Sequence, residues 1–308
     1  MKNNYYNEIK KELLNNEIYI KVKDYSKNRN ELSTYYNVGK LLIEAQGGED
    51  RAKYGDGLIK EYSLKLSKEI GRKYNITTLK RMRQFYLIIG KGATLWHQLS
   101  WSHYRELLPI SNINEINYYI SEIEKNNLSV RQLRERIRNK EYQRLDDKTK
   151  LKLINKEEID IKDNIKNPII IKNKLDIDKE IVSEKILQRL ILEDIPSFLE
   201  ELGTGYSFIK NEYKIKIGER YNYIDLLLFN IEYNCYVVVE LKVTELKKEH
   251  IGQIQIYMNY IDNSLRKLTQ DKTIGLIICK KDNKYVIEYS SDKRILSREY
   301  ELINTNWL

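Results

Sequence analysis

The segment Tyr236-Val237-Val238-Val239-Glu240-Leu241-Lys242 is the stretch of the chain that says most about its fold. Valines occupy both even and odd positions, so both faces of the segment are apolar, which is typical of a central strand covered on each side. A second apolar segment, Tyr223–Phe229, precedes it across the short connection Asn230–Asn234. We therefore expect the two segments to be neighbouring strands of one sheet.

Further patterns around these strands predict an α/β domain over residues 183–308. A helical pattern runs through Ile186 and Leu190, and Pro196 is expected to interrupt or restart the helix before it ends at Leu202-Gly203. The other expected elements are strands at Phe208-Ile209, Tyr213–Ile217, Thr273–Cys279 and Tyr285–Tyr289, and a helix from about Lys248 to Leu268. This alternation of helices and strands is typical of an α/β arrangement.

Residues 1–145 have a helical pattern instead, with apolar residues recurring at spacings of three and four. Within this region Thr77–Tyr86 is expected to be a helix capped at a threonine. Its first turns carry Lys80, Arg81 and Arg83, although cations there oppose the helix dipole. Because helix stability does not explain them, these three side chains are our candidates for contacts with nucleic-acid phosphates.

Residues 146–182 separate these two regions and differ from both in composition. Asp, Lys, Asn and Ile dominate, aromatic residues are absent, and Asn167-Pro168 interrupts the middle. The isoleucines give the segment some capacity to pack, so we expect a linker with partial structure. The sequence thus predicts a helical domain over 1–145, a linker over 146–182 and an α/β domain over 183–308.

Positive charge is concentrated in the first half of the chain. The net charge is +9, but residues 1–150 carry 29 cationic against 19 acidic side chains, whereas residues 151–308 carry 25 against 26. A local basic surface attracts polyanions, and a nucleic-acid backbone is the commonest large one. The alternative is the solvated face of an ordinary helical domain.

Several classes of protein are disfavoured by composition. No stretch approaches the roughly 20 apolar residues of a membrane-spanning helix, and the polar N-terminus is unlike a secretory signal, so we expect a cytoplasmic protein. The cysteines, Cys235 and Cys279, lie in or beside apolar runs, and the three histidines lack metal-ligand spacing. We therefore expect reduced, buried thiols and neither a disulfide framework nor a zinc site.

Asp225, Glu240 and Lys242 form the pattern that points to chemistry. Alternate side chains of a strand share a face, so Glu240 and Lys242 point the same way, and the short connection can bring Asp225 beside Glu240. Two adjacent carboxylates suit Mg²⁺, which takes oxygen ligands and keeps several waters. Lys242 could then orient the attacking water or the scissile phosphate. The alternative is an ion pair between Glu240 and Lys242 at a strand end, but a buried Asp225 would still call for a partner.

The helix that follows adds two polar candidates. Gln253 and Tyr257 are four residues apart and therefore lie on one helical face. We expect both to support the site, although Tyr257 could equally be a core residue with Gln253 incidental.

In this order and on these elements, Asp225, Glu240-x-Lys242 and Gln253-x-x-x-Tyr257 resemble the PD-(D/E)xK nuclease core. Here Tyr223-Ile224 precedes the aspartate in place of the usual proline. The chain as a whole resembles the YhcG-type nucleases, and the linker matches poorly. The matching motifs are Tyr35-Tyr36-Asn37-Val38-Gly39, Tyr54-Gly55, Met82–Tyr86, Leu99–His103, Phe198–Tyr206, Tyr223–Leu227, Val239–Lys242 and Gly252-Gln253.

The resemblance implies a restriction-endonuclease-like C-terminal domain, with a mixed sheet flanked by helices, and a mainly helical, winged-helix-like N-terminal domain. It also implies metal-dependent endonucleolytic hydrolysis of DNA, with Mg²⁺, or Mn²⁺ in its place, held by Asp225 and Glu240. Members of the superfamily often add a glutamate from the first helix of the domain. Glu193, Glu200 and Glu201 compete for that position, and Glu193, which lies 32 residues before Asp225, is preferred.

Other aromatic and polar residues of the N-terminal region are interpreted structurally. Trp96, Trp101, Phe85 and Tyr86 have helical spacing and are expected in a core rather than stacked on bases. His103 is expected to be a polar structural residue.

The partners expected from all of these observations are DNA, a further protein bound by the N-terminal domain, and a second copy of the chain. The resemblance is compatible with a role in DNA recombination or repair or in mobile-element defence. The rival hypothesis is a non-catalytic DNA-binding or scaffold protein that uses a nuclease-like fold.

Overall fold

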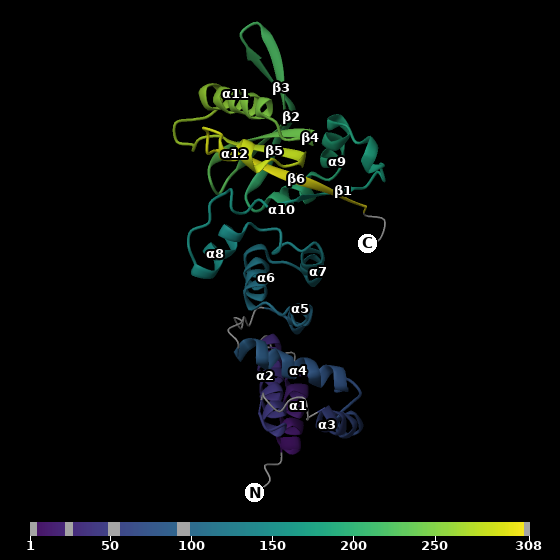
Figure 1. Ribbon diagram of the computed structural model, residues 1–308. Helices are drawn as coiled ribbons and strands as arrows, with labels where there is room; N and C mark the ends of the chain where they lie inside the picture. Colours follow the sequence, from purple (N-terminus) through teal and green to yellow (C-terminus); the bar gives the residue numbers. More distant parts are fainter. Residues whose placement is uncertain (1–4, 22–26, 49–55, 91–98, 305–308) are drawn as a thin grey trace. The chain divides into compact units, whose positions relative to one another are not determined.

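The computed structural model describes residues 5–21, 27–48, 56–90 and 99–304 (Figure 1). The chain divides into two compact units, residues 1–142 and 143–308. In the described part of the chain, no helix is both long enough and apolar enough to cross a membrane.

The first unit is helical, as its sequence pattern predicts. Its helices are α1 (Tyr5–Lys21), α2 (Lys27–Ala45), α3 (Asp56–Glu69), α4 (Ile76–Gly90), α5 (Trp101–Leu107), α6 (Ile113–Asn126) and α7 (Val130–Arg138). Fully buried Leu13, Leu42, Leu79 and Phe85 form part of its core. Within the described residues of this unit we find no β-strand, so the wing of a winged-helix domain is not present there.

Polar side chains cap helices of the first unit, and one cap differs from the residue expected from the sequence. Ser129 caps α7, and the side chain of Gln132 bonds back to its backbone in a capping box, which accounts for the start of this basic helix. Helix α4, however, begins one residue before the expected threonine cap. The side-chain oxygen of Asn75 accepts the backbone N–H of Thr78 at 3.0 Å, so asparagine satisfies the free donor there.

Gly39 of α2 is required by the close approach of α4. A Cβ atom at this position would lie 2.3 Å from the carbonyl oxygen of Met82 and 2.8 Å from the Cβ of Tyr86. Since the nearest of these atoms is helix backbone, the two helices would have to move apart. We expect Gly39→Ala to lower the free energy of unfolding by about 3 kcal/mol. Chemical denaturation followed by circular dichroism measures this change.

Gly57→Ala is the matched control for that substitution. Gly57 lies in α3, and no atom of the described residues comes within 4 Å of the position that an alanine Cβ would take, so the change should be neutral or slightly stabilising. Equal stabilities of the two variants would contradict the proposed backbone contact.

The described residues of the second unit form a six-stranded sheet with helices on both faces. Its strands are β1 (Ile169–Asn173), β2 (Tyr206–Ile217), β3 (Arg220–Asn230), β4 (Cys235–Glu245), β5 (Ile274–Lys281) and β6 (Ile295–Asn304), in the order β1-β6-β5-β4-β3-β2. Its helices are α8 (Asp147–Asn155), η2 (Lys179–Ile181), α9 (Glu184–Glu193), α10 (Ile195–Leu202), α11 (Lys248–Ser264) and α12 (Lys284–Glu288). Strands β4, β5, β6 and β1 are parallel to one another, whereas β3 is antiparallel to both of its neighbours, β2 and β4. The sheet is therefore mixed, as expected.

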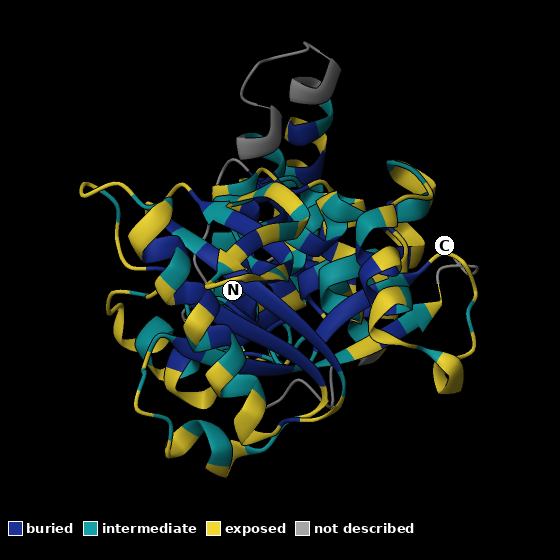
Figure 2. Ribbon diagram, turned by 90° about the horizontal axis from the view of Figure 1, so that it is seen from above, coloured by how far each residue is buried: buried dark blue, intermediate teal, exposed yellow. Residues whose placement is uncertain are grey.

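Each face of the sheet carries its own hydrophobic core, and the central strands are buried (Figure 2). Val237, Val239 and Leu241 of β4 pack with residues of α9 and α10. Val238 lies on the other face with residues of α11. The prediction that this segment is a central strand covered on both sides is thus confirmed. The alternation places Glu240 and Lys242 on the face of Val238.

Residues 285–289 do not form the strand that their sequence suggested. They lie in and beside α12, and Val286 and Ile287 pack against the core on the α11 face. The reason is topological: β5 and β6 are parallel, so the chain must return along the sheet between them. The last strand in the chain is β6, which the sequence patterns had not indicated.

Residues 146–182 contain α8, β1 and η2. Strand β1 pairs in parallel with β6 and forms one edge of the sheet. Its Ile169 and Ile171 are buried in the core shared with α9 and α10, so the isoleucines of this segment serve the sheet.

Candidate active site

Asp225 lies where strands β3 and β4 separate. The two strands pair from Leu226↔Val239 to Asn230↔Cys235, and one step further along this register places Asp225 opposite Glu240. The Oδ2 atom of Asp225 accepts the backbone N–H of Leu241 at 2.8 Å. A second bond fixes its backbone, because the Gln188 side chain of α9 donates to its carbonyl oxygen at 3.0 Å. The position of this carboxylate is therefore determined by both β4 and α9.

Glu240 is buried, with 1% of its surface exposed. Its Oε2 lies 3.3 Å from the ammonium nitrogen of Lys242. Its Oε1 is buried and has no hydrogen-bond partner among the described residues. Burial, and next the nearby charge of Asp225, raise the pKa of Glu240 to about 8. Buried polar atoms normally have partners, so this oxygen is arranged for a group that the protein alone does not supply.

Lys242 is surrounded by carboxylates. Burial acts to lower the pKa of Lys242, but the charges of Glu240, Glu184 and Asp225 outweigh it and raise the pKa. Its side chain is therefore an ammonium group at neutral pH, able to donate hydrogen bonds and to neutralise negative charge but unable to accept a proton.

The carboxylate that α9 brings to this group belongs to Glu184. Its Oε2 lies 3.7 Å from the Lys242 nitrogen. Glu193, the preferred residue from the sequence, is nine positions later, about two and a half turns away on the opposite side of the helix. There it lies 3.8 Å from Arg189.

The two other glutamates that competed with Glu193 lie in α10. Glu201 pairs with Arg144 and accepts the backbone N–H of Ile170 of β1, and Glu200 is exposed. The distance in sequence from Asp225 could not identify Glu184, because it does not indicate which side of α9 faces the site.

Gln253 and Tyr257 of α11 interact as their spacing suggests. The Gln253 side-chain amide donates to the Tyr257 hydroxyl at 3.1 Å. Burial raises the pKa of Tyr257, the hydrogen bond from Gln253 acts to lower it, and the charges of Glu240 and Asp225 act to raise it further. The hydroxyl is thus within electrostatic reach of both carboxylates. Tyr257 also packs in the core beneath α11, which is one of the two roles that the sequence left open.

The donor set fits a small divalent cation. In the described part of the chain, no three or more His, Cys, Asp and Glu side chains form a complete metal cage. Mg²⁺ does not need one, since it is typically held by one or two carboxylates together with waters and substrate phosphate. Asp225 and Glu240 supply two carboxylates. The Oε1 atom of Glu240 has no hydrogen-bond partner among the described residues and can therefore bind a cation.

The basic residues expected to contact phosphate are only partly available. Lys80 of α4 is exposed, and Arg81 is half-buried. The side chain of Arg83 donates to that of Gln46 at 2.8 Å, so part of its guanidinium is occupied within the unit. Of the three side chains, that of Lys80 is the most exposed.

The aromatic residues of the first unit are structural, as expected. Phe85 is buried and packs edge-on against Trp101. His103 shares a hydrogen bond with Ser100 at 2.9 Å at the start of α5 and another with the Leu128 carbonyl at 3.0 Å. Trp96 and the motif Tyr54-Gly55 lie outside the described residues. In the second unit, Cys235 and Cys279 are buried free thiols.

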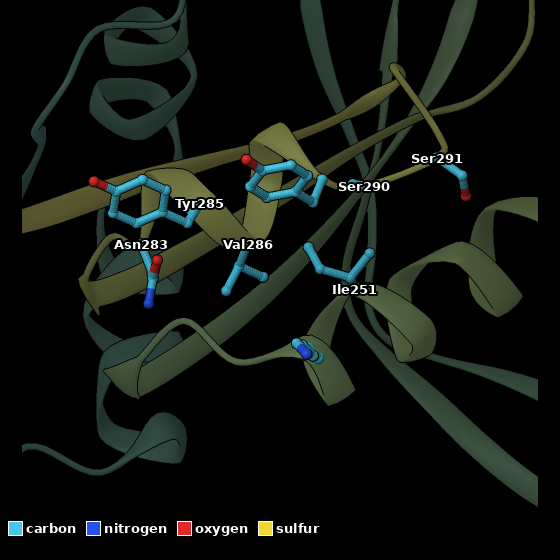
Figure 3. A pocket seen from close by; sticks show the side chains of 8 residues that line it. Ile251, Asn283, Tyr285, Val286, Ser290 and Ser291 are labelled. Carbon is cyan, nitrogen blue, oxygen red and sulfur yellow. The ribbon is translucent and has the colours of Figure 1, made fainter.

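A separate cavity of about 640 Å³ lies between the first turns of α11 and α12 (Figure 3). Residues lining it include Lys248, Ile251, Asn283, Tyr285 and Val286. None of Asp225, Glu240 and Lys242 lines it, so this cavity is not the candidate active site.

Comparison with known families agrees with this geometry. Residues 162–306 match the family model described as the YhcG PDDEXK nuclease domain. The C-terminal unit belongs to this nuclease family. Residues 15–144 match the model of the DUF1016 N-terminal domain, so the two models together span most of the chain. The resemblance seen in the sequence and the restriction-endonuclease-like fold class are thereby confirmed.

A named relative aligns with most of the chain. The Escherichia coli (strain K12) protein named "Putative nuclease YhcG" is 26% identical over 310 residues, covering 88% of this chain and 83% of the relative. Two solved structures align over 40% of this chain with TM-scores of 0.28. They are a repair endonuclease from Pyrococcus abyssi, at 17% identity and 47% of its length, and the EndoMS-dsDNA2 complex, at 20% identity and 44% of its length. These alignments span less than half of either solved chain.

Proposed function

We propose that this chain is a divalent-metal-dependent endonuclease that hydrolyses phosphodiester bonds of DNA. One observation supports it above all others: Asp225, Glu240 and Lys242 converge at the separation of β3 and β4, and a buried oxygen of Glu240 has no partner among the described residues. A site used only for binding would gain nothing from a desolvated carboxylate of this kind.

The cation would be held by Asp225 and Glu240, with Mg²⁺ as the physiological ion and Mn²⁺ as a substitute. PDDEXK nucleases generally use divalent metal ions, and the oxygen ligands of this chain are those that Mg²⁺ prefers. When bound, the ion supplies electrostatic stabilisation of the charge that develops on the phosphate.

The protein's own groups supply positioning. The ammonium group of Lys242 donates a hydrogen bond to Oε2 of Glu240 at 3.3 Å and can also orient a water or a phosphate oxygen at the site. The peptide N–H of Leu241 holds the Asp225 carboxylate in place. Gln253 and Tyr257 form a hydrogen-bonded pair on α11 that would support the site from that helix.

The activity is tested by incubating the purified chain with supercoiled plasmid, branched DNA and single-stranded DNA, with Mg²⁺, with Mn²⁺ or with EDTA. Metal-dependent nicking or linearisation of the plasmid is expected, with no product in EDTA. Binding of DNA without cleavage in either metal would instead support the non-catalytic hypothesis.

Glu184→Gln is expected to lower the rate of cleavage about tenfold. Glu184 lies beside Lys242 and contributes to the charge that keeps its ammonium protonated, and supporting carboxylates of metal sites have effects of about 10- to 100-fold. Initial rates at saturating DNA measure the change. Glu193→Gln is the matched control on the same helix and should stay within about twofold of wild type. A larger loss of cleavage rate in Glu193→Gln than in Glu184→Gln would identify Glu193 as the glutamate that α9 contributes to the site.

We further propose that the helical N-terminal unit binds DNA or a protein partner. The excess of cations in residues 1–150 and the exposed Lys80 support this role. Charge reversal at Lys80 should weaken DNA binding by the full chain if the partner is DNA, and should leave it unchanged if the partner is a protein.

A further inference from the structure

Strands β2 and β3 continue well past the sheet as a two-stranded ribbon (Figure 1). Strand β3 pairs with β4 from Leu226 onward, whereas its pairing with β2 extends to Ile217↔Arg220. We define the ribbon as residues 210–217 and 220–225, joined by the turn Gly218-Glu219. It begins at Asp225, and six residues of strand span about 20 Å. The ribbon therefore projects directly from the candidate active site.

One face of the ribbon is basic and aromatic. The register pairs Lys214 with Tyr223 and Lys216 with Tyr221, and paired residues share a face. The opposite face is apolar, because Ile215 is buried in the core beneath α11. We call the four outward residues Lys214, Lys216, Tyr221 and Tyr223 the ribbon patch.

The ribbon patch is accessible to a large ligand. Tyr221 and Tyr223 are 56% and 52% exposed. The ammonium nitrogen of Lys214 lies 3.8 Å from the centre of the Tyr221 ring. The ammonium nitrogen of Lys216 lies 4.0 Å from Oε2 of Glu219. Both groups are exposed, so this ion pair contributes little to stability. Both cations can therefore turn to an external anion at small cost.

We propose that the ribbon patch binds the duplex that flanks the cleavage site, with the ribbon lying in the major groove. This inference rests on the proposed function and adds its substrate-binding surface. A two-stranded ribbon fits a B-DNA major groove, which is about 12 Å wide. At 3.4 Å per base pair, a ribbon of about 20 Å follows roughly six base pairs from the cleaved phosphate. Lysine and tyrosine side chains are both common donors to phosphate oxygens.

Protection of a free strand edge explains only part of this pattern. Strand β2 is at the edge of the sheet, and lysines on edge strands discourage pairing with other chains. That role does not account for half-exposed tyrosines opposite the lysines. Nor does it account for the position of the patch beside Asp225, where substrate must lie.

The test is fluorescence anisotropy of the full chain with a labelled duplex of about three helical turns, in EDTA so that no cleavage is needed. Removing two phosphate contacts should weaken binding about 30-fold near 0.15 M salt and reduce the slope of log K against log[salt] by about 1.8. Lys214→Glu/Lys216→Glu is expected to produce at least this change. Tyr221→Ala/Tyr223→Ala should weaken binding about fivefold with the salt slope unchanged, since it removes no charge.

Lys179→Glu/Lys267→Glu is the matched control. It makes the same change in net charge at two exposed lysines on η2 and after α11. An equal loss of affinity in the control, or no loss in Lys214→Glu/Lys216→Glu, would overturn the assignment while leaving the proposed nuclease activity standing.

Two further measurements separate other occupants of the patch. A loss of affinity for a single strand that equals or exceeds the loss for the duplex would overturn the assignment to duplex DNA. If light scattering shows that the lysine variant dissociates an oligomer while its duplex affinity is unchanged, the patch binds a second copy instead.

Discussion

Asp225→Asn is expected to reduce the rate of DNA cleavage at saturating substrate by about a thousandfold or more, with duplex affinity in EDTA within about threefold of wild type. The amide oxygen of asparagine can still accept the Leu241 N–H, so the local backbone should be retained. The substitution removes one of two negative charges that would hold the cation. Single-turnover cleavage of a labelled duplex, with anisotropy for binding, measures the two quantities separately.

Asp271→Asn is the control for that loss of charge. Asp271 is exposed and precedes β5, and its replacement should leave cleavage unchanged. Cleavage by Asp225→Asn at a rate near that of wild type would remove the proposed mechanism, whatever the variant does to DNA binding. If Asp225→Asn loses both cleavage and stability, seen as a lower melting temperature, the milder Asp225→Glu variant would separate the two effects. That variant keeps the negative charge but moves it.

Glu240→Gln is expected to abolish cleavage and, at the same time, to stabilise the metal-free protein. The pKa of Glu240 is about 8 in the folded chain against an ordinary 4.5. As pH rises from 4.5 to 8, the unfolded chain loses this proton while the folded chain retains it, so folded stability falls through that window. Glutamine does not titrate and escapes this loss. We expect a gain of roughly 2 kcal/mol at pH 8 in EDTA, or about 5 °C in the melting temperature of the second unit.

Calorimetry across pH checks the sign of this effect. The difference between Glu240→Gln and wild type should shrink toward pH 4.5, where both side chains are neutral. It should also shrink when Mg²⁺ is added, because the ion stabilises only the form that binds it. Glu301→Gln, an exposed glutamate on β6, should show neither dependence. If Glu240→Gln melts no higher than wild type in EDTA at pH 8, the Oε1 atom of Glu240 must already have a hydrogen-bond partner in the metal-free protein.

The separation of strands at Asp225 links these two predictions. The same divergence that frees the Asp225 carboxylate from regular pairing leaves Glu240 facing it without a hydrogen-bond partner for Oε1 among the described residues. The protein therefore carries a local instability at the point where a cation would bind. Such a relation between stability and function is common at active sites, where activity requires groups that folding alone would not favour.

The sequence by itself determined the parts of this protein that depend on local pattern. Valines on both faces of residues 236–239 identified β4 as a central strand, and the spacing of Glu240 and Lys242 put them on one face. The spacing of Gln253 and Tyr257 likewise put them on one helical face, where the structure shows a hydrogen bond between them. These features follow from the periodicities of strands and helices, which are properties of a few consecutive residues.

Tertiary structure alone decided which distant groups meet. Glu184 and Glu193 lie on opposite sides of α9, and the packing of that helix brings Glu184, and not Glu193, to Lys242. Parallel pairing of β5 with β6 makes residues 284–288 a helix, and the free length of β2 and β3 creates the ribbon. The physical reason is that helix crossings, strand order and strand ends are set by packing between segments far apart in the chain. No local periodicity records these contacts.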